Sequence, residues 1–335
     1  MSKFSSEIAQ EVIASMKEPE LVNRGSETMG RTFWAMETTD PGYVAFVAEH
    51  PSYLNNDGVI TPAVYTTFAL AYAAMTTNRN DTLVIASYGE FSEAMHTVSK
   101  SRCHFLGSDA GGRINSQGSK LSTPATSVAA SIAVINNTGT RNTYRNIKFI
   151  QQGTNAAQTS AFIDAGEGTY MKNCCVHQNN LLTTANTQAL LFKGDTCHYE
   201  DCEIGNSTVT HNVDNQAPLV IKTPARYSYF INCKFIQYSL KTTASCIDVP
   251  DANGIIGWIM FENCKLVSAS KGDGTTAAGT MAEAVTSVAT SGYLYFDSRC
   301  NSFQTTRFGE ADASILSAAI EPKANGTGGI AIVSA

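Results

Sequence analysis

The sequence predicts an all-β protein: a right-handed, single-stranded parallel β-helix with an N-terminal capping helix and a small irregular N-terminal segment. Two observations predict it. A strand-forming motif recurs in register along the chain, and a helical segment stands before the first repeat. The 335 residues are 43% hydrophobic and only 16% charged, which supplies apolar material for a long core.

The recurring motif is an aromatic residue or Met, then any residue, Asn or Asp, Cys or Ile, any residue and an apolar residue. Its five copies begin at Tyr144, Met171, Tyr199, Phe230 and Phe261, at steps of 27, 28, 31 and 31 residues. A second apolar strand precedes each copy, beyond a group of turn residues, and the five strands are expected at 132–134, 161–163, 189–191, 219–221 and 246–249. One coil of about 25–30 residues cannot bury its apolar side alone, so the spacing predicts coils stacked about 4.8 Å apart.

Equivalent positions in stacked coils should form ladders of like side chains. The Asn position is expected at a bend, where each amide bonds backbone groups and the amides above and below it. The predicted structural ladder comprises Asn146, Asn173, Asp201, Asn232 and Asn263, together with Cys174, Cys202, Cys233 and Cys264. An antiparallel sandwich is the alternative, but it predicts turns about every 8–12 residues without in-register copies.

Cysteine usage predicts free thiols. The nine cysteines are an odd number, and the polar N-terminus lacks the apolar core of a secretory signal. We therefore expect buried thiols made in a reducing compartment.

Residues 1–58 are expected to form an N-terminal docking or anchor segment. It begins with an amphipathic helix over residues 5–17 and continues as an irregular stretch with too many aromatic residues for a disordered linker. The docking candidates in this stretch are Phe33, Trp34, Tyr43, Phe46 and Tyr53.

The parallel β-helix is expected to span residues 59–310. A capping helix over 62–76, with Thr61 as its N-cap, should cover the edge of the first coil, because an open edge would recruit other strands. Residues 271–290, rich in Gly, Thr and Ala, are expected to form an insertion, and residues 311–335 a C-terminal tail.

Two stretches resemble the pectin methylesterase family. The stretch from Tyr65 to Gly107 resembles the opening of that family, with its turn at Gly89-Glu90-Phe91-Ser92-Glu93. The stretch from Gln188 to Gly205 resembles the family's Gln-Ala-Val-Ala-Leu strand and the Phe-Tyr-Asn-Cys motif behind it. The resemblance covers residues 60–270 and implies a β-helix of the pectin-lyase-like kind.

The same resemblance implies an ester-cleaving site with a carboxylate nucleophile, an acid/base Asp, two Gln side chains that hold the oxyanion, and an Arg. Gln188 matches the first Gln. Asn206 and Ser207 stand where the family has Gln-Asp, and Gln237-Tyr238-Ser239 stands where it has an Asp beside aromatic residues. No Arg-x-Trp follows. We therefore expect no catalytic residue and no cofactor.

Lyase or hydrolase chemistry would need carboxylates gathered on one face. The candidate acids are Asp195, Asp201 and Glu203, or Asp248 and Asp251. A turn explains Asp195 and the ladder explains Asp201. Three histidines lack metal-ligand spacing and are expected at the surface or in turns: His177, His198 and His211. No metal ligand is expected.

Charge and hydropathy argue against two classes of partner. The net charge is −6 and Lys and Arg form no cluster, so we expect no nucleic-acid partner. No stretch approaches the roughly 20 apolar residues of a membrane span, so we expect no membrane partner.

A short docking segment before a β-helix poor in catalytic groups resembles virion proteins of tailed bacteriophages, both decoration (cement) proteins and tailspike-like proteins. The first hypothesis is a non-enzymatic capsid decoration protein, made in the host cytoplasm, which forms homotrimers and contacts other capsid or tail proteins of the virion. The alternative is a tailspike or receptor-binding protein that binds or degrades a host surface polysaccharide, and aromatics with paired acids on one exposed groove would favour it. A third hypothesis, an esterase of pectin methylesterase type, lacks its acids.

Overall fold

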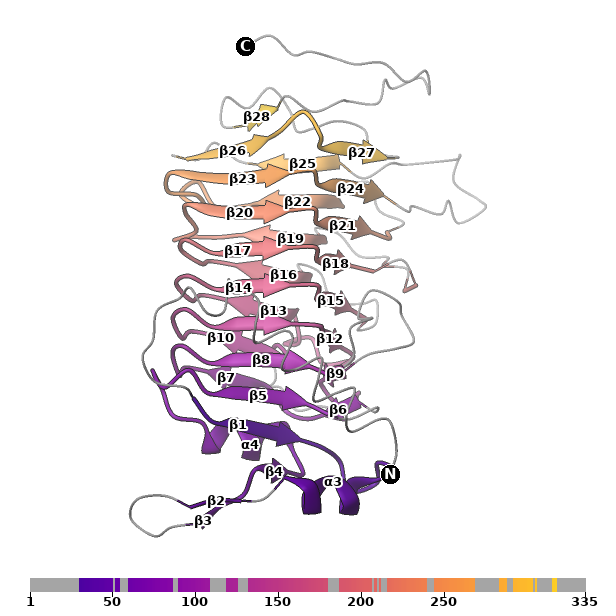
Figure 1. Ribbon diagram of the computed structural model, residues 1–335. Helices are drawn as coiled ribbons and strands as arrows, with labels where there is room; N and C mark the ends of the chain where they lie inside the picture. Colours follow the sequence, from indigo (N-terminus) through magenta and orange to yellow (C-terminus); the bar gives the residue numbers. More distant parts are fainter. Residues whose placement is uncertain are drawn as a thin grey trace.

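The computed structural model describes residues 30–50, 52–54, 60–86, 90–108, 119–125, 132–179, 187–206, 208–209, 211, 216–239, 244–268, 283–287, 292–303, 305 and 315–317. Within these residues the chain winds into a column of stacked coils (Figure 1). Their strands form three long sheets, in which every strand pair is parallel. The predicted parallel β-helix is confirmed.

The first of these sheets, sheet 1, has eleven strands. In spatial order they are β4 (Val64–Tyr65), β1 (Thr32–Ala35), β5 (Thr82–Ile85), β8 (His104–Gly107), β11 (Thr143–Arg145), β14 (Tyr170–Lys172), β17 (His198–Glu200), β20 (Ser228–Ile231), β23 (Trp258–Glu262), β26 (Tyr293–Phe296) and β28 (Ile315–Ser317).

Sheet 2 has eight strands and sheet 3 has seven. Sheet 2 contains β6 (Glu90–Ser92), β9 (Ser119–Ser122), β12 (Ile147–Gln151), β15 (Cys175–Gln178), β18 (Glu203–Gly205), β21 (Lys234–Gln237), β24 (Lys265–Ser268) and β27 (Asn301–Phe303). Sheet 3 contains β7 (His96–Val98), β10 (Ile135–Asn137), β13 (Ser160–Asp164), β16 (Gln188–Phe192), β19 (Ala217–Ile221), β22 (Ser245–Val249) and β25 (Glu283–Ser287). A separate antiparallel pair joins β2 (Tyr53–Leu54) to β3 (Ile60–Thr61).

The second apolar strand that the sequence predicts in each coil is the sheet 3 strand. Four of the five lie where expected, and the first is displaced from 132–134 to β10. The reason is burial: Ile132 is exposed, whereas Ile135 is fully buried in the core.

The inner face of sheet 1 carries the predicted aromatic ladder. Its motif position pairs in register from coil to coil, and the rings of Tyr199, Phe230, Phe261 and Phe296 stack face to face at centroid distances of 4.6–5.1 Å. All four rings are fully buried. Burial of one such side chain contributes about 1.5–3 kcal/mol, so the stack is a main source of cohesion between coils.

The Asn position forms the bend between sheet 1 and sheet 2. Its five members have φ between 50° and 56°, in the left-handed region that Asn and Asp tolerate better than most residues. Asn173 Nδ2 donates to Asn146 Oδ1 at 2.7 Å, and Asn263 Nδ2 donates to Asn232 Oδ1 at 2.7 Å. All five positions lie at the bend, and amide bonds join two neighbouring pairs of them, while Asp201 in the middle has no amide to donate. The bend divides each motif into two short strands.

The Cys position lies directly after the bend and points into the core. Cys174, Cys202, Cys233 and Cys264 are buried and free, as are the other five cysteines. The later thiols point at a backbone carbonyl of the preceding coil, as Cys264 does toward Phe230 at 3.2 Å. Cys300 extends the ladder by one further coil, because its thiol faces the Phe261 carbonyl at 3.2 Å.

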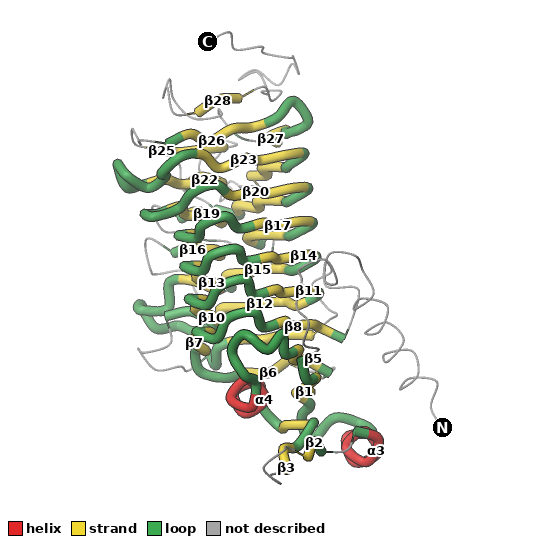
Figure 2. Tube along the Cα trace, turned by 60° about the vertical axis from the view of Figure 1, so that its left-hand side comes forward, coloured by secondary structure: helices red, strands yellow, loops and turns green. Residues whose placement is uncertain are grey.

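Helix α4 (Phe68–Ala74) covers the N-terminal end of the column (Figures 1 and 2). It is shorter than the predicted helix over 62–76. Its N-cap is Thr67, whose side chain accepts from the Leu70 N–H, and not Thr61. The physical reason is competition, since the residues after Pro62 form β4 and pair with β1.

Two side chains from the following coil hold both ends of α4. Glu93 accepts hydrogen bonds from the N–H groups of Phe68 and Ala69, at 2.8 and 3.1 Å. Lys100 Nζ donates to three carbonyls of the last turn, including Met75 at 2.6 Å. The first turn lacks internal acceptors for its N–H groups and the last turn lacks donors, so this clamp satisfies both.

The structure places three predicted accessory segments partly inside the β-helix. From the predicted docking segment, β1 pairs with β5 in sheet 1. From the predicted insertion 271–290, β25 pairs with β22 in sheet 3, and from the predicted tail 311–335, β28 pairs with β26. The reason is that every unpaired strand edge gains hydrogen bonds when another strand covers it. The helix predicted over residues 5–17 lies outside the described residues.

Helix α3 (Tyr43–Glu49) packs on the outer side of sheet 1 at the N-terminal end. Neither of the two described helices has the length and hydropathy of a membrane-spanning helix.

Candidate functional site

A cluster of aromatic side chains lies on the outer face of sheet 1 near the C-terminal end of the described column. We call it the aromatic face, and it comprises Tyr227, Tyr229, Trp258, Tyr293 and Tyr295. Trp258 is paired in register with Tyr293 on the next coil, and the residues two positions later on each strand point to the same side. The Trp258 ring lies 4.9 Å from that of Tyr229 and 5.8 Å from that of Tyr227. The cluster thus spans three coils, about 10 Å along the column.

These rings are accessible to a ligand. Tyr293 is 51% exposed, and Tyr227 and Tyr295 are also exposed. Inward neighbours on the same strands, such as Phe230 and Phe261, are fully buried. Folding usually removes large groups of apolar side chains from water. A group of aromatic rings that stays exposed therefore often marks a binding site.

Tyr227 has an unusual backbone conformation. Its φ is 46°, which costs a bulky side chain about 1–2 kcal/mol. The ring lies over Gly257, where an added Cβ would come within 2.5 Å of it. Strain that the surrounding structure maintains is often found at functional positions, and here it presents an aromatic ring at the surface.

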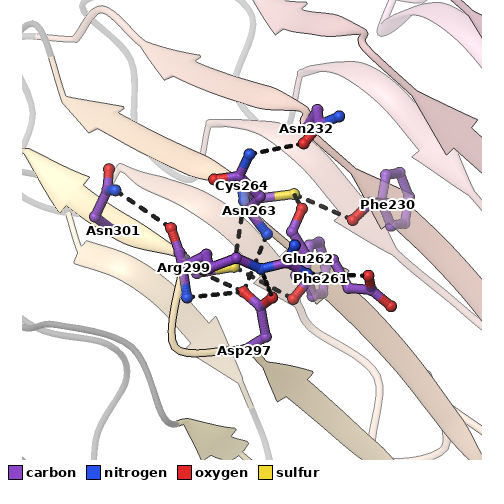
Figure 3. Close-up of polar contacts among 10 residues, drawn as sticks. Phe230, Asn232, Phe261, Glu262, Asn263, Cys264, Asp297, Arg299 and Asn301 are labelled. Carbon is purple, nitrogen blue, oxygen red and sulfur yellow. Dashed lines mark hydrogen bonds and ion pairs between the residues drawn. The ribbon is translucent and has the colours of Figure 1, made fainter.

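Three charged side chains follow the aromatic residues on the same strands or in the next turn, and Figure 3 shows the contacts among these three, Glu262, Asp297 and Arg299. Glu262 follows Trp258 on the same face of β23, and its carboxylate lies 3.2 Å from the Arg299 guanidinium. Arg299 also pairs with Asp297 at 2.6 Å. Hydrogen bonds from Arg299 and from backbone N–H groups outweigh partial burial and lower the pKa of Asp297. These groups offer both donors and acceptors beside the rings.

The predicted docking residues lie at the other end of the column, and the structure corrects part of that prediction. Phe33 is fully buried in the main core, and Trp34 is only 6% exposed. Trp34 packs against Phe46 at a ring distance of 5.2 Å, in a small cluster under α3 that Tyr43 also contacts. The Tyr53 hydroxyl bonds a backbone carbonyl of β1. These aromatics attach the N-terminal segment to its own β-helix, because β1 is a strand of sheet 1.

Two residues at the positions of the esterase motif form hydrogen bonds within the chain. Gln188 is buried, and its Nε2 donates to Ser160 Oγ on the neighbouring strand at 2.6 Å. Asn206 is buried as well; its Nδ2 donates to the Gln178 carbonyl at 2.5 Å, and its Oδ1 accepts two backbone N–H groups of the next turn. These amides stabilise strand ends and a turn.

The third motif position carries an amide with the same role. Gln237 is buried at the end of β21, and its Nε2 faces the Gln216 carbonyl at 3.4 Å. Ser207 lies outside the described residues. The motif positions therefore bring no carboxylate together.

The candidate acids lie in different places. Asp195 pairs with Arg226 at 2.7 Å in the turn between sheet 3 and sheet 1, and Asp201 occupies the Asn ladder. Burial raises the pKa of Asp248 to about 6, an effect that Lys222 opposes and Asp251 strengthens. Asp248 belongs to sheet 3, so it does not lie on the face that carries the exposed aromatics.

The fifth acid, Glu203, belongs to a cluster that the sequence analysis missed. Cys175, His177 and Glu203 place one thiol, one imidazole nitrogen and one carboxylate oxygen within 4.8 Å of one another on sheet 2. His177 is buried and not at the surface as expected, and burial lowers its pKa. The signal was present: Cys-x-His puts two side chains on one face of a strand, and Glu203 pairs in register with Cys175 one coil later.

The other two histidines lie apart. His198 is half-buried on the outer face of sheet 1, between the rings of Tyr170 and Tyr229. His211 is buried against Asn206, and burial lowers its pKa to about 4. Turn or surface placement is therefore wrong for His177 and His211.

Comparison with known proteins identifies the fold. No family model matches the chain, and no curated protein matches it. Among solved structures it is similar to the pectin methylesterase from Aspergillus niger, with 14% identity over 90% of each chain and a TM-score of 0.50. It is also similar to the pectate lyase Pel9A, with 12% identity over 83% of this chain and 64% of that one and a TM-score of 0.47.

A third similar structure is the pectin methylesterase PemA from Erwinia chrysanthemi, with 12% identity over 87% of this chain and 93% of that one and a TM-score of 0.43. The likeness to the Aspergillus structure shows a right-handed β-helix of the pectin-lyase-like fold. At this level of identity it carries no information about particular residues or chemistry.

Proposed function

We propose that this protein binds a polysaccharide on the aromatic face and does not cleave it. The observation that carries the proposal is the exposed cluster of three tyrosines around Trp258 and Tyr229, flanked by the Glu262–Arg299 pair. The exposed Tyr rings, with the half-buried Trp258 between them, offer flat apolar surfaces with a polar edge, on which the C–H faces of sugar rings stack. The flanking charged groups offer hydrogen-bond partners for hydroxyl groups.

The absence of cleavage is supported by what occupies the esterase positions. Gln188, Asn206 and Gln237 are buried and hydrogen-bonded within the chain. A nucleophile or acid/base group must reach its substrate, which these amides do not. Beside the aromatic face, Glu262 and Asp297 are both paired with Arg299, which favours a binding role for them over acid/base chemistry.

The test measures binding of the purified protein to a panel of bacterial and plant polysaccharides by affinity electrophoresis, followed by calorimetry on the best ligand. Trp258→Ala should weaken binding by at least about tenfold, because one stacked ring contributes on the order of 1–3 kcal/mol. The matched control is Phe303→Ala, since Phe303 is an exposed aromatic on sheet 2, away from the aromatic face. Equal affinities of both variants and the parent, or release of reducing ends or methanol from the ligand, would contradict the proposal.

A second candidate function is a place in a bacteriophage virion, as a decoration or receptor-binding protein that forms homotrimers. One observation favours a docking surface at the N-terminal end. Helix α3 packs Tyr43 and Phe46 against the cluster that contains Trp34. Its other side leaves Val44 81% exposed, and Val47 one turn later is exposed as well. Such an apolar strip suits contact with another virion protein, and it is compatible with polysaccharide binding at the opposite end of the column.

This second proposal is tested by cryo-electron microscopy of purified particles and by incorporation of variants. Changing both Val44 and Val47 to Ser should leave the fold intact, because both are exposed, and should reduce the amount of protein found in particles. Ile60→Ser, at another exposed apolar position, is the control. Absence of the parent protein from particles, or unchanged incorporation of the double variant, would rule the surface out.

A further inference from the structure

The cluster of Cys175, His177 and Glu203 on sheet 2 lies apart from the aromatic face and is not explained by stacking of the coils. We propose that these three residues bind a transition-metal ion of the Zn²⁺ type, with a fourth position left for another ligand. The inference is independent of polysaccharide binding.

The backbone places the three side chains together. The side chains of Cys174, just before β15, and of Val176 on β15 point into the core, so those of Cys175 and His177 both point to the outer face of sheet 2. Glu203 on β18 pairs in register with Cys175, which places its carboxylate beside the thiol on the next coil. The rigid spacing of two stacked strands thus holds the three groups in place before any ion arrives.

The distances fit a tetrahedral ion. The donor atoms of the three residues lie within 4.8 Å of one another, and His177 Nε2 lies 3.2 Å from Glu203 Oε1. Two N or O ligands at about 2.0–2.1 Å from a tetrahedral Zn²⁺ lie about 3.3 Å apart. A thiolate, an imidazole and a carboxylate are the three ligand types that zinc accepts, whereas Ca²⁺ and Mg²⁺ prefer oxygen alone.

The burial and hydrogen bonding of His177 support the metal site independently of the distances between the ligand atoms. The residue is only 2% exposed, yet Nδ1 has no hydrogen-bond partner and Nε2 faces only the Glu203 carboxylate, at 3.2 Å. An unsatisfied buried donor or acceptor costs about 1–3 kcal/mol. An ion bound between His177 and Glu203 would satisfy one nitrogen. Burial also favours the neutral imidazole, which is the form that binds metals.

The charge balance is compatible with a divalent ion. Binding replaces the proton of the Cys175 thiol with the metal, so one proton leaves for each ion bound. The thiolate and the Glu203 carboxylate then neutralise the two positive charges. Lys148, which pairs in register with Cys175, adds one positive charge, and its pKa is lowered because it is buried. We therefore expect affinity to rise with pH as the thiol proton is lost more easily.

The experiment uses the full chain, stripped with a chelator under reducing conditions and then titrated with Co²⁺ as a spectroscopic substitute for Zn²⁺. Bound Co²⁺ should show the near-ultraviolet charge-transfer band of a cobalt thiolate and the intense visible bands of a tetrahedral site. Elemental analysis after gel filtration with Zn²⁺ should give about one ion per chain.

Three variants assign the ligands: Cys175→Ser, His177→Gln and Glu203→Gln. The first two should bind the metal at least about 100-fold more weakly, because loss of even an outer-shell partner typically costs 10- to 100-fold. Cys175→Ser should also remove the charge-transfer band while eight other thiols remain. Glu203 is half-buried, so its isosteric change preserves folding and keeps the test informative.

His198→Gln and Glu262→Gln, at outward positions on sheet 1, are the matched controls and should bind like the parent. A parent chain that binds no metal, or variants with unchanged stoichiometry and spectra, would overturn the proposal.

Discussion

Tyr229 and Phe230 are neighbours in the sequence but belong to two rows of side chains, one on the outer and one on the inner face of sheet 1. The two rows differ in how far the residue type repeats from coil to coil. Phe230 points inward, where its register partners on adjacent coils, Tyr199 and Phe261, are also aromatic and stack on it. Tyr229 points outward, where its partners are His198 and Met260. The inner position repeats its residue type from coil to coil, and the outer position does not.

This contrast indicates that the stacking of coils constrains the inner positions and not the outer ones. An inner position must match the volume and shape of the residues above and below it, because the core is close-packed. An outer position lies outside this close-packed ladder, so its residue type is free to serve another purpose. Clusters on the outer faces of sheets 1 and 2 therefore carry more information about function than the repeat that defines the fold.

The largest effect expected from this comparison concerns the two neighbouring rings. Phe230→Ala should lower the free energy of unfolding by about 3–5 kcal/mol, because it leaves a cavity in the aromatic ladder. Tyr229→Ala should lower it by only about 1 kcal/mol, because Tyr229 is half-buried outside the core and its removal leaves no enclosed cavity, while weakening polysaccharide binding. Urea unfolding of both variants measures the difference, and comparable losses of stability would contradict the division into inner and outer rows.

A smaller effect is expected at the bend. Asn173→Ala should cost about 2 kcal/mol, because Ala is disfavoured at φ 53° and cannot bond Asn146. Asn173→Gly tolerates the left-handed backbone, so it should recover about 1 kcal/mol of that loss. Thermal unfolding of the two variants separates backbone strain from the amide ladder, and an Ala variant as stable as the parent would show that the ladder is dispensable.

The smallest effect is expected at the clamp on α4, and it depends on pH. Burial alone would raise the pKa of Glu93, but hydrogen bonds from His96 and the N–H groups of Phe68 and Ala69 outweigh it and lower the pKa below its ordinary 4.5. A carboxyl whose pKa is lower in the folded chain stabilises above its ordinary pKa, and loses this contribution as the pH falls through the folded value.

At neutral pH, Glu93→Gln should therefore lower the free energy of unfolding by about 1 kcal/mol. The difference from the parent should shrink as the pH falls below about 4.5. Denaturant unfolding at several pH values measures it, with Glu167→Gln at an exposed position as the control. A difference that stays constant into acid would contradict the role of the ionised carboxylate.

Much of the scaffold could be predicted because its constraints are periodic. The Asn and Cys ladders, the aromatic ladder and the second strand of each coil all follow from side chains that recur at coil spacing. The limits of the N-terminal segment, the insertion and the C-terminal tail were harder to predict. Nothing in the local sequence shows that β1, β25 or β28 will find an open strand edge far along the chain, so these strands were assigned to accessory segments.

The candidate sites were predicted least well, again for a physical reason. The aromatics chosen from the sequence, Phe33 and Trp34, are buried, because a cluster of aromatics near the N-terminus looks the same whether it faces solvent or packs under a helix. The aromatic face joins Tyr229 to Trp258, 29 positions further on, and Trp258 to Tyr293, 35 positions further on, and only the stacking of coils brings them together.

The parallel β-helix, its register and the bend at each Asn could be predicted from the sequence alone, because stacking requires like residues at like positions. The repeat pairs Glu203 with Cys175, because both occupy the fifth position of the motif, but it does not state that His177 is buried or that the three side chains approach within 4.8 Å. These contacts, and the approach of Tyr227 and Tyr229 to Trp258, follow only from the folded chain, because they depend on side-chain packing and on turns whose lengths differ between coils.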